Sequence, residues 1–412
     1  MTDTAQKIAE MREQAQKRLV DLARLIAPKV PSGQRTLGYV LPQSNRIGHL
    51  ATELQVLLTR YTDRYEHFVV VTAPLDLPGT NRWIPQAAGS RITIIECADQ
   101  MLLALGVLGA GLIPGPGFDI LLPHKRPFLT DFFRYLADGH APARFSLTEE
   151  TEDRALKALE GSSFDPTRPF VVLHIRTNAY MKSLTHHGHR TATAADYASS
   201  IRFLLEKGLQ VLRIGEANIG EIGVEDSGFI EVPRAAPHEN AVDLFALARA
   251  QFMLGQTSGP IWAAAAFGTP VVRSNLILHH LDFPQNADIS LYKDFRDNKS
   301  GKRLTLIEIF NRRLASVDDE KQYEALGVTV EDSTPDDILS ATEEMFRQIS
   351  SASGTLDHDP RQTRFKQLGG AYNAELQSYA EMKARGLDFF GPAFSKDRVA
   401  TVFLDTRPDF LD

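Results

Sequence analysis

The segment Phe170-Val171-Val172-Leu173-His174-Ile175-Arg176 is a short apolar run that ends in two side chains able to form hydrogen bonds. A run of this kind predicts a buried β-strand, with His174 and Arg176 at its carboxyl end. The guanidinium of Arg176 is permanently charged and presents a fork of donors, which suits the oxygens of a diphosphate. The segment therefore predicts an anion-binding sheet edge, and a plain surface ion pair is the alternative for Arg176.

Further apolar runs alternate with helical patterns on both sides of this strand. Alternation of this kind predicts Rossmann-like domains, in which crossover helices join parallel strands. Turn-forming residues concentrate at Gly161-Ser162-Ser163, so we place one such domain at residues 161–285. Its expected elements are a helix at 194–207, strands at 209–215 and 228–233, a helix at 241–250, a strand at 252–258, a helix through Trp262 and a strand at 270–275.

An earlier series with the same alternation predicts another Rossmann-like domain at residues 31–160. A chain of 412 residues exceeds what one core usually organises, which also favours two domains. The expected fold class is α/β, with two parallel-sheet domains facing a cleft, an N-terminal amphipathic helix within residues 1–30, and a C-terminal extension of loops and crossing helices at 286–412. The earlier series comprises strands at 36–42, 68–74, 91–97 and 119–123, a helix at 48–60, and a core helix or loop at 101–113.

Composition excludes several classes of protein. The net charge is -7 and the Lys and Arg residues are scattered, which argues against a nucleic-acid partner. Cys97 is the single cysteine, so an intrachain disulfide and a multi-thiolate metal site are excluded and a reducing compartment is favoured. We find no signal-peptide pattern and no apolar run of membrane length, and we expect a cytoplasmic protein. The basic flank of the helix at 4–27 also suits peripheral contact with an anionic inner membrane, as an alternative to docking on the protein body. The sequence leaves the oligomeric state open.

The run Gly255-Gln256-Thr257-Ser258-Gly259-Pro260 separates an expected strand from an expected helix. Glycine lets a backbone approach a ligand closely, hydroxyls donate hydrogen bonds, and a helix N-terminus offers N–H groups and a positive dipole end. We therefore expect the residues from Thr257 to Pro260 to bind phosphate; an ordinary capped turn is the alternative. Gly215 and Glu216 end another strand at the same rim, where they would meet a nucleoside unless Glu216 is a solvated loop acid.

His49 is the candidate catalytic residue of the N-terminal half. It belongs to Asn45-Arg46-Ile47-Gly48-His49-Leu50, which follows an expected strand and opens an expected helix. An imidazole at such a strand end suits abstraction of a proton from a hydroxyl, while a structural histidine is the alternative. Glu53, one turn further along the helix, or Asp119 would orient the ring.

Two clusters raise the question of a metal ion. Histidines at positions 186, 187 and 189 lack the carboxylates or thiolates that usually complete a zinc site, so we favour a loop over the phosphates. Asp357 and Asp359 form an Asp-x-Asp pair, but they follow a Ser- and Gly-rich tract and suit a solvated loop. We expect no metal and no other cofactor.

The order of elements from about residue 35 to residue 275 resembles the GT-B glycosyltransferases. The strand ending in His174-Ile175-Arg176, together with Thr257-Ser258-Gly259-Pro260 before a helix, is similar to their fucosyltransferase and heptosyltransferase group. Over most of its length the chain also resembles bacterial glycosyltransferases of polysaccharide gene clusters. This resemblance rests on Asn45 to Leu50, Val171 to Arg176, Arg190 to Tyr197, Val211 to Glu216, Leu254 to Pro260 and the tail Gly391-Pro392-Ala393-Phe394.

The resemblance implies roles for particular residues. Arg176 would contact the pyrophosphate of a nucleotide-sugar, Thr257 to Gly259 would cradle it, and His49 would occupy the place of the catalytic base. Thr191 and Thr193 depart from the Asn and Asp expected after Arg190, which puts the contacts of those positions in doubt. The residues expected near donor or acceptor, beyond those named, are Arg46, Gly48, Asn178, Arg190 and Tyr197.

These observations predict a glycosyltransferase that moves a sugar from a GDP- or UDP-sugar to a hydroxyl of a glycan, a lipid-linked glycan or a protein. With His49 as base and Arg176, His174 and the Thr257–Gly259 turn stabilising the leaving group, transfer would invert the anomeric centre without a metal. Two alternatives remain open: a sugar-nucleotide epimerase or hydrolase that needs no acceptor, and a non-catalytic protein that binds a nucleotide or glycan.

Overall fold

A computed structural model of the protein describes residues 17–77, 79–177, 190–235, 239–285, 287–317, 319–351 and 358–412. The chain divides into two compact units, one up to Thr148 and one from Glu149 onward. Both are mixed α/β units with parallel sheets and helices, as the alternating apolar pattern predicts. No helix within the described ranges is long and apolar enough to cross a membrane.

In the described part of the first unit, five strands form one sheet in the order β3-β2-β1-β5-β4. Strands β1 and β2 are largely apolar and buried along their length, and β1 pairs in parallel with both β2 and β5. The sheet agrees with the expected strands except at its edge, where β4 runs antiparallel to β5 in a segment expected to be a helix or loop. The bounds are β1 Thr36–Leu41, β2 His67–Thr72, β3 Ile92–Glu96, β4 Gly111–Ile113 and β5 Phe118–Leu122.

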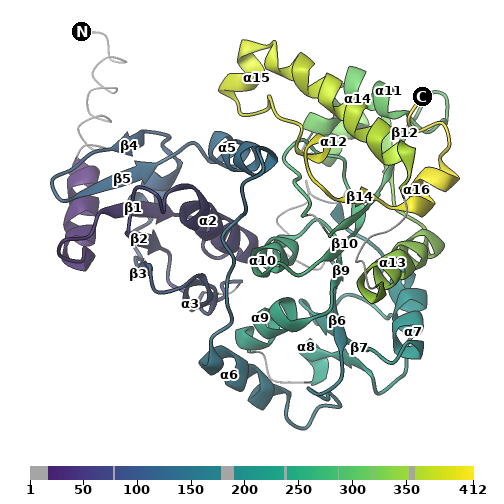
Figure 1. Cartoon of the computed structure of the whole chain (residues 1–412), viewed down its shortest axis with the longest axis horizontal. Coiled ribbons are helices and arrows are strands. Elements are labelled where there is room, and N and C mark those ends of the chain that lie inside the picture. Colours follow the sequence, from purple (N-terminus) through teal and green to yellow (C-terminus); the bar gives the residue numbers. More distant parts are fainter. Residues whose placement is uncertain are drawn as a thin grey trace. The chain divides into compact units, whose positions relative to one another are not determined.

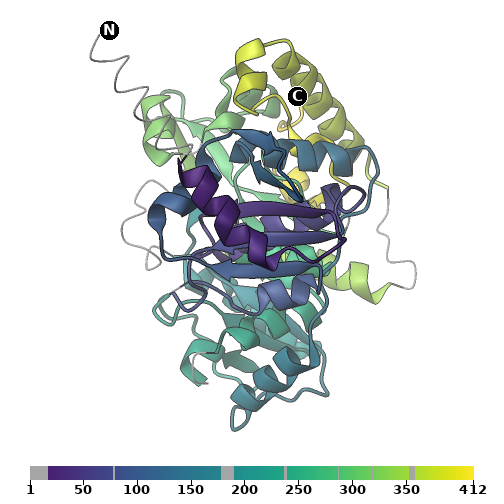
Figure 2. The same ribbon diagram turned by 90° about the vertical axis from the view of Figure 1, so that its left-hand side faces the viewer.

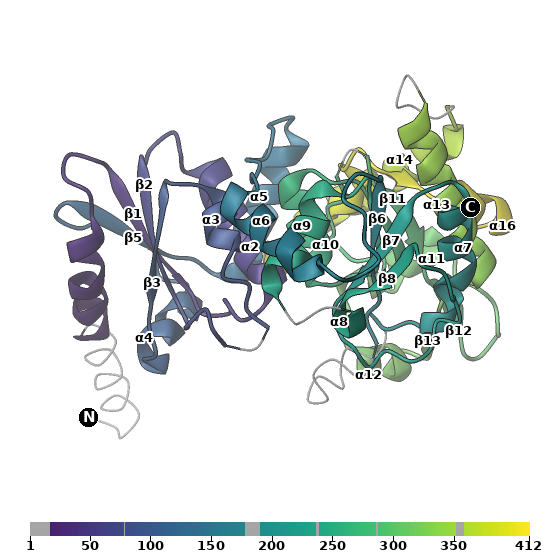
Figure 3. The same ribbon diagram turned by 90° about the horizontal axis from the view of Figure 1, so that it is seen from below.

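Helices cover both faces of the first sheet (Figures 2 and 3). Residues 17–26 are helical, and Leu22 and Ile26 pack against Val40 and Val69 of the sheet. Residues 4–16 of the expected amphipathic helix lie outside the described residues. Helices α2 and α3 lie on the opposite face (Figure 3). The remaining bounds are η1 Ala27–Lys29, α2 Ile47–Arg60, α3 Ile84–Ala88, α4 Gln100–Leu103, η2 Ala104–Val107 and α5 Lys125–Ala137.

The second unit contains a larger sheet, whose described strands follow the order β14-β11-β10-β9-β6-β7-β8 and all pair in parallel. The predicted strand at Phe170 is central strand β6, and it is buried up to its last residue, His174. Strands β12 and β13 pair with each other in a separate antiparallel sheet of two strands. The bounds are β6 Phe170–His174, β7 Gln210–Ile214, β8 Phe229–Glu231, β9 Met253–Gly255, β10 Val271–Leu276, β11 Ile289–Tyr292, β12 Asp294–Asp297, β13 Val328–Glu331 and β14 Arg398–Val399.

Helices also cover both faces of the second sheet. Helices α9 and α10 lie on one face, and α7 and α13 lie on the other (Figure 1). The bounds are α6 Glu149–Leu159, η4 Ala194–Tyr197, α7 Ala198–Glu206, α8 Val232–Ala235, α9 Asn240–Arg249, α10 Gly259–Phe267, α11 Leu306–Asn311, η5 Leu314–Ser316, α12 Glu320–Ala325, α13 Pro335–Ser350, α14 Pro360–Gln377, α15 Ala380–Ala384, η6 Gly391–Ala393 and α16 Thr401–Thr406.

The division between the units falls before α6 rather than near residue 160. Helix α6 packs against α9, and two ion pairs join these helices: Arg249 to Glu152 at 2.5 Å and Arg154 to Glu239 at 2.6 Å. The acidic first turn of α6 therefore belongs with the second sheet, which periodicity alone does not reveal.

Residues 287–317, 319–351 and 358–412 belong to the second unit and contribute to its core, whereas the sequence predicted a C-terminal extension of loops and crossing helices. They supply β11 and β14 to the sheet, and Phe365 and Phe403 pack in the same cluster as Val171 and Leu173 of β6. The tail glycine Gly391 fits tightly, because a Cβ atom there would lie 2.2 Å from the carbonyl oxygen of Asp282. The Gly391–Phe394 motif therefore has a packing role.

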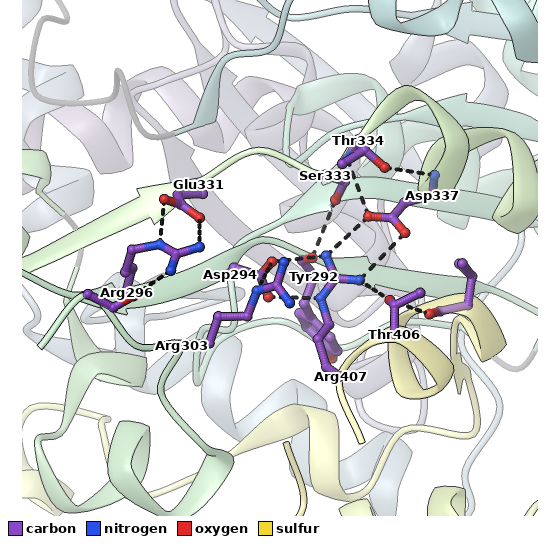
Figure 4. A network of polar contacts seen from close by, with 12 residues as sticks. Tyr292, Asp294, Arg296, Arg303, Glu331, Ser333, Thr334, Asp337, Thr406 and Arg407 are labelled. Carbon is purple, nitrogen blue, oxygen red and sulfur yellow. Dashed lines mark hydrogen bonds and ion pairs between the residues drawn. The ribbon is translucent and has the colours of Figure 1, made fainter. Parts of the chain in front are cut away.

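A buried network of polar side chains ties the C-terminal segment to this core (Figure 4). The guanidinium of Arg407 donates to both carboxylate oxygens of Asp294, at 2.8 and 2.9 Å, and to Asp337 at 3.1 Å. Asp337 in turn forms a capping box with Thr334 at the start of α13. One side chain near the end of the chain thus joins β12, α13 and the segment after α16.

Candidate functional site

The second unit brings together the two segments that the sequence analysis singled out. Strands β6 and β9 are neighbours, and their register pairs His174 with Gly255, so the residues after both strands meet at one carboxyl edge. The backbone N–H of Arg176 donates to Oε1 of Gln256 at 2.5 Å. Arg176 therefore lies beside the turn that leads into α10, as an anion site at this edge requires.

His174 sits between the α10 turn and the end of β7. Its Nδ1 lies 3.2 Å from the hydroxyl of Ser258, which itself donates to the carbonyl of Gln256 at 3.1 Å. Because Ser258 has one hydroxyl proton, this arrangement favours a proton on Nδ1 and a lone pair on Nε2. Burial, with the nearby charges of Arg176 and Arg213, lowers the pKa of His174 to about 4. The ring is therefore neutral near pH 7, so His174 contributes hydrogen bonds to this edge and not a positive charge.

Gly215 leaves room for this ring. It follows β7 with a φ of +97°, and a Cβ atom there would lie 2.9 Å from Cδ2 of His174. We expect Gly215→Ala to lower the free energy of unfolding by about 1–3 kcal/mol, because the backbone conformation is strained for L-residues and the imidazole has to move. Urea unfolding of Gly215→Ala is compared with that of Gly220→Ala. Gly220 also has a positive φ, but a Cβ atom added there has no described atom within 4 Å, so the comparison separates the contact with His174 from backbone strain. Equal losses in the two variants would contradict the role of the ring.

The N-terminus of α10 has donors that the described residues leave unused. Ser258 is the N-cap residue, but its side chain makes no capping hydrogen bond, because its hydroxyl is directed to Gln256 and His174. Among the described residues, Oγ1 of Thr257 and Nε2 of Gln256 are buried and have no hydrogen-bond partner. Buried polar groups are normally paired, so these two side-chain atoms at the N-terminus of a helix point to an anionic ligand.

Two further residues of this edge were missed as site residues by sequence reasoning. Gln256 is fully buried and links Arg176 to the turn, and its amide within a Gly-rich run was the available signal. Arg213 is fully buried in β7, where its Nε lies 2.8 Å from Glu231 and its Nη1 donates to the carbonyl of Glu216 at 2.5 Å. It thereby holds the exposed Gly215–Glu216 turn; an arginine inside an otherwise apolar strand was the signal.

The segment from Arg190 to Tyr197 is only partly at this edge. Tyr197 is fully buried and its hydroxyl lies 2.8 Å from that of Ser274, so it packs in the core rather than facing a ligand, contrary to expectation. The carbonyl of Thr191 accepts from Lys293 at 2.9 Å, and Thr193 begins η4 without a side-chain cap. The positive charge of Arg190 acts on Asp282, whose pKa is nevertheless raised by burial. Asn178 lies outside the described residues.

In the first unit, His49 projects from the first turn of α2 and its side chain is 35% exposed. Its Nδ1 lies 3.1 Å from Oε1 of Glu53, one helical turn later, which confirms one of the two orienting partners considered. The other, Asp119, instead accepts from the hydroxyl of Tyr65 at 2.6 Å. Arg46 is the N-cap residue of α2 without a side-chain cap, and Gly48 is buried.

Glu53 is buried and accepts from two groups besides His49. The hydroxyl of Tyr39 donates to its Oε2 at 2.6 Å, and Nζ of Lys125 also contacts Oε2. Burial raises the pKa of Glu53, but the hydrogen bond from His49 and the charge of Lys125 outweigh it, so the pKa is lowered overall. An ionised Glu53 accepts from Nδ1–H of His49 and leaves Nε2 able to take a proton.

Within the described ranges, no group of three or more His, Cys, Asp or Glu side chains is placed to hold a metal ion. The histidines at 186, 187 and 189, and Asp357, lie outside the described residues. Asp359 accepts from the backbone N–H of Arg361 as the N-cap of α14 and also pairs with the guanidinium of Arg361 at 2.8 Å. Cys97 is buried.

The sequence matches no protein-family model and no curated protein. Among solved structures, the chain is similar to the dodecameric iron-containing heptosyltransferase TibC in complex with ADP-D-β-D-heptose, with 15% identity, a TM-score of 0.40 and coverage of 77% of this chain and 78% of that chain. It is also similar to a family 9 glycosyl transferase from Veillonella parvula, with 12% identity, a TM-score of 0.40 and coverage of 76% and 97%. TibC from enterotoxigenic E. coli H10407 matches at 15% identity and a TM-score of 0.33, over 58% of this chain and 57% of that chain. At identities and TM-scores this low, we base the proposed function on the geometry of the chain itself.

Proposed function

We propose that the protein is a glycosyltransferase of the GT-B type, which transfers a sugar from a nucleotide-sugar to a hydroxyl of a glycan, a lipid-linked glycan or a protein. One observation carries this proposal: the turn before α10 holds buried donors, on Gln256 and Thr257, that have no partner among the described residues and lie directly beside Arg176. A strand-to-helix turn that offers amides, a hydroxyl and an arginine suits a diphosphate better than any neutral ligand.

The donor is held at this edge of the second sheet. Arg176 and the first amides of α10 neutralise the two phosphates and stabilise the charge that appears on the departing nucleoside diphosphate. Neutral His174 does not add charge; it fixes the hydroxyl of Ser258 and supports the turn. Gly215 and Glu216, on the adjacent strand end, suit the nucleoside of a GDP- or UDP-sugar. These groups supply the electrostatic stabilisation, so the reaction proceeds without a metal.

The acceptor is activated in the first unit. Nε2 of His49 takes the proton of the acceptor hydroxyl, whose oxygen forms a bond to the anomeric carbon while the bond from that carbon to the diphosphate oxygen breaks. The proton resides on the imidazole and the electron pair leaves with the nucleoside diphosphate. A single displacement of this kind inverts the anomeric centre.

Thermal unfolding with UDP, GDP, CMP and ADP tests the donor site. A nucleoside diphosphate that binds at 100 times its Kd stabilises the protein by about 2.7 kcal/mol. We expect one or two diphosphates to raise the Tm of the wild type and to lose this effect in Arg176→Ala, because the permanent charge beside the turn is gone. Arg347→Ala is the matched control, since Arg347 is 61% exposed and pairs with Glu343 in its own helix. An equal Tm increase in Arg176→Ala and wild type would remove the basis of the proposal.

The nucleotide-sugars that correspond to the nucleotides of this panel, assayed with and without acceptor, distinguish the proposal from its alternatives. Consumption of the donor alone would identify an epimerase or hydrolase. Stabilisation by a nucleotide-sugar with no turnover under any acceptor condition would identify a binding protein.

A further inference from the structure

We propose that Lys125 is a positioning residue for His49: together with Tyr39 it fixes Glu53 as a carboxylate, and Glu53 in turn fixes which nitrogen of His49 can accept a proton. This inference rests on the proposed function for its catalytic meaning. The structural link itself, Lys125 to Glu53 to His49, is independent of any substrate.

Hydrogen bonds connect four side chains, those of His49, Glu53, Tyr39 and Lys125, and the two oxygens of Glu53 have different partners. Oε1 of Glu53 faces Nδ1 of His49, whereas Oε2 receives both Lys125 and the hydroxyl of Tyr39. Nζ of Lys125 also donates to the Tyr39 hydroxyl at 2.7 Å and lies 4.7 Å from the centre of its ring. The Tyr39 hydroxyl therefore donates a hydrogen bond to Glu53 while it accepts one from Lys125.

Because the Glu53 carboxylate is buried, it needs a cation and hydrogen-bond donors beside it to stay ionised. The side chain of Glu53 is 2% exposed and Tyr39 is fully buried, while that of Lys125 is 23% exposed. A buried carboxylate is costly unless opposite charge and hydrogen bonds compensate, and Lys125 is the cation that contacts it. Burial lowers the pKa of Lys125 and Glu53 partly restores it, so the two groups support each other's charge. Tyr61, the C-cap residue that follows α2, is a further titratable group whose charge acts on Tyr39.

The charge of Glu53 decides the tautomer of His49. An ionised Oε1 can only accept, so it requires the proton of neutral His49 on Nδ1 and leaves the lone pair on Nε2. A protonated Glu53 would instead donate to Nδ1 and place the ring proton on Nε2, where no proton could then be accepted. Lys125 therefore acts on the base through Glu53, although it makes no contact with His49 in any described hydrogen bond or ion pair.

The test follows the His49 ring in the full chain by ¹⁵N NMR, with neither donor nor acceptor present. In the wild type at neutral pH we expect the proton on Nδ1. Lys125→Met keeps the length of the side-chain stem but removes its charge. In this variant we expect the pH at which the His49–Glu53 pair loses its extra proton to be higher than in the wild type by about one unit or more. Lys125→Arg, which restores the charge, should titrate close to the wild type.

Two results would overturn the proposal. One is a folded Lys125→Met variant in which the tautomer and titration of His49 are those of the wild type. The other is a wild-type ring with its proton on Nε2 at neutral pH, which needs no variant and so holds even if Lys125→Met fails to fold. Tyr39→Phe supplies a second variant, because it removes one hydrogen bond to Glu53 without changing a charge. Since none of these readouts uses turnover, a chain with the expected titration but without transferase activity would contradict the proposed function and leave the positioning role standing.

Discussion

Replacing His49 by alanine is expected to lower the rate of sugar transfer by about 100- to 10,000-fold at neutral pH, the usual contribution of a general base. The imidazole is the group that would receive the acceptor proton, and Glu53 orients it from 3.1 Å. The measurement is initial-rate kinetics with the donor that the thermal-shift panel identifies. The loss should appear in kcat, because the proton is transferred in the reaction itself and not when the donor binds.

Two features of the variant make the result interpretable. Glu53 keeps its contacts with Tyr39 and Lys125 after the ring is removed, so the first unit should stay folded. Under the proposed function a nucleotide binds in the second unit, beside Arg176 and the α10 turn, so the Tm increase caused by nucleotide should persist.

His140→Ala is the matched control for His49→Ala. His140 is another exposed histidine of the first unit, and it stacks on Tyr135 with ring centroids 3.8 Å apart. The His140→Ala variant should transfer sugar at the wild-type rate. If His49→Ala turns over nearly as fast as the control, with the same product stereochemistry, another group accepts the proton.

Local patterns predicted strands β1, β2, β3 and β5 of the first sheet and β6 to β10 of the second, together with helices α2, α7, α9 and α10, but not helices α5, α6, α13 and α14. Buried parallel strands are uninterrupted apolar runs, and β6 has this form from Phe170 to Leu173. Contacts within one helical turn were also accessible, since His49 and Glu53 are four residues apart and share a helix face. Strand β14 could not be found in this way, because its two residues, Arg398 and Val399, are too few to show a period.

Contacts between distant segments explain most of the remaining differences. Lys125 is 72 residues from Glu53 and Gln256 is 80 residues from Arg176, and only the folded chain brings these pairs together. Tyr197 shows the converse: its neighbours in sequence suggested a ligand loop, but it packs against β10 through Ser274. The neutral state of His174 is likewise a property of its buried surroundings and not of its position in the sequence.

Arg407→Met is expected to lower the free energy of unfolding by about 3–5 kcal/mol, the cost of leaving buried charges without their partner. The side chain of Arg407 is 4% exposed and donates to Asp294 and Asp337. Methionine keeps much of the apolar contact with Phe403, over whose ring the guanidinium lies at 4.6 Å, so the loss reports the charge. Urea unfolding, followed by circular dichroism, measures it.

Arg303→Met separates the effect of burial from that of charge alone. Arg303 pairs with the same carboxylate, Asp294, at 3.1 Å, but its side chain is 44% exposed (Figure 4). An exposed pair contributes at most about 1 kcal/mol, because water solvates the arginine when the pair is broken. A large loss for Arg407→Met beside a small loss for Arg303→Met would show that the residues after α16 are fastened to β12 and α13 by a desolvated ion pair. Similar losses in the two variants would mean that water reaches Asp294 and Asp337 once Arg407 is removed, and that apolar packing alone holds the C-terminal segment in the second unit.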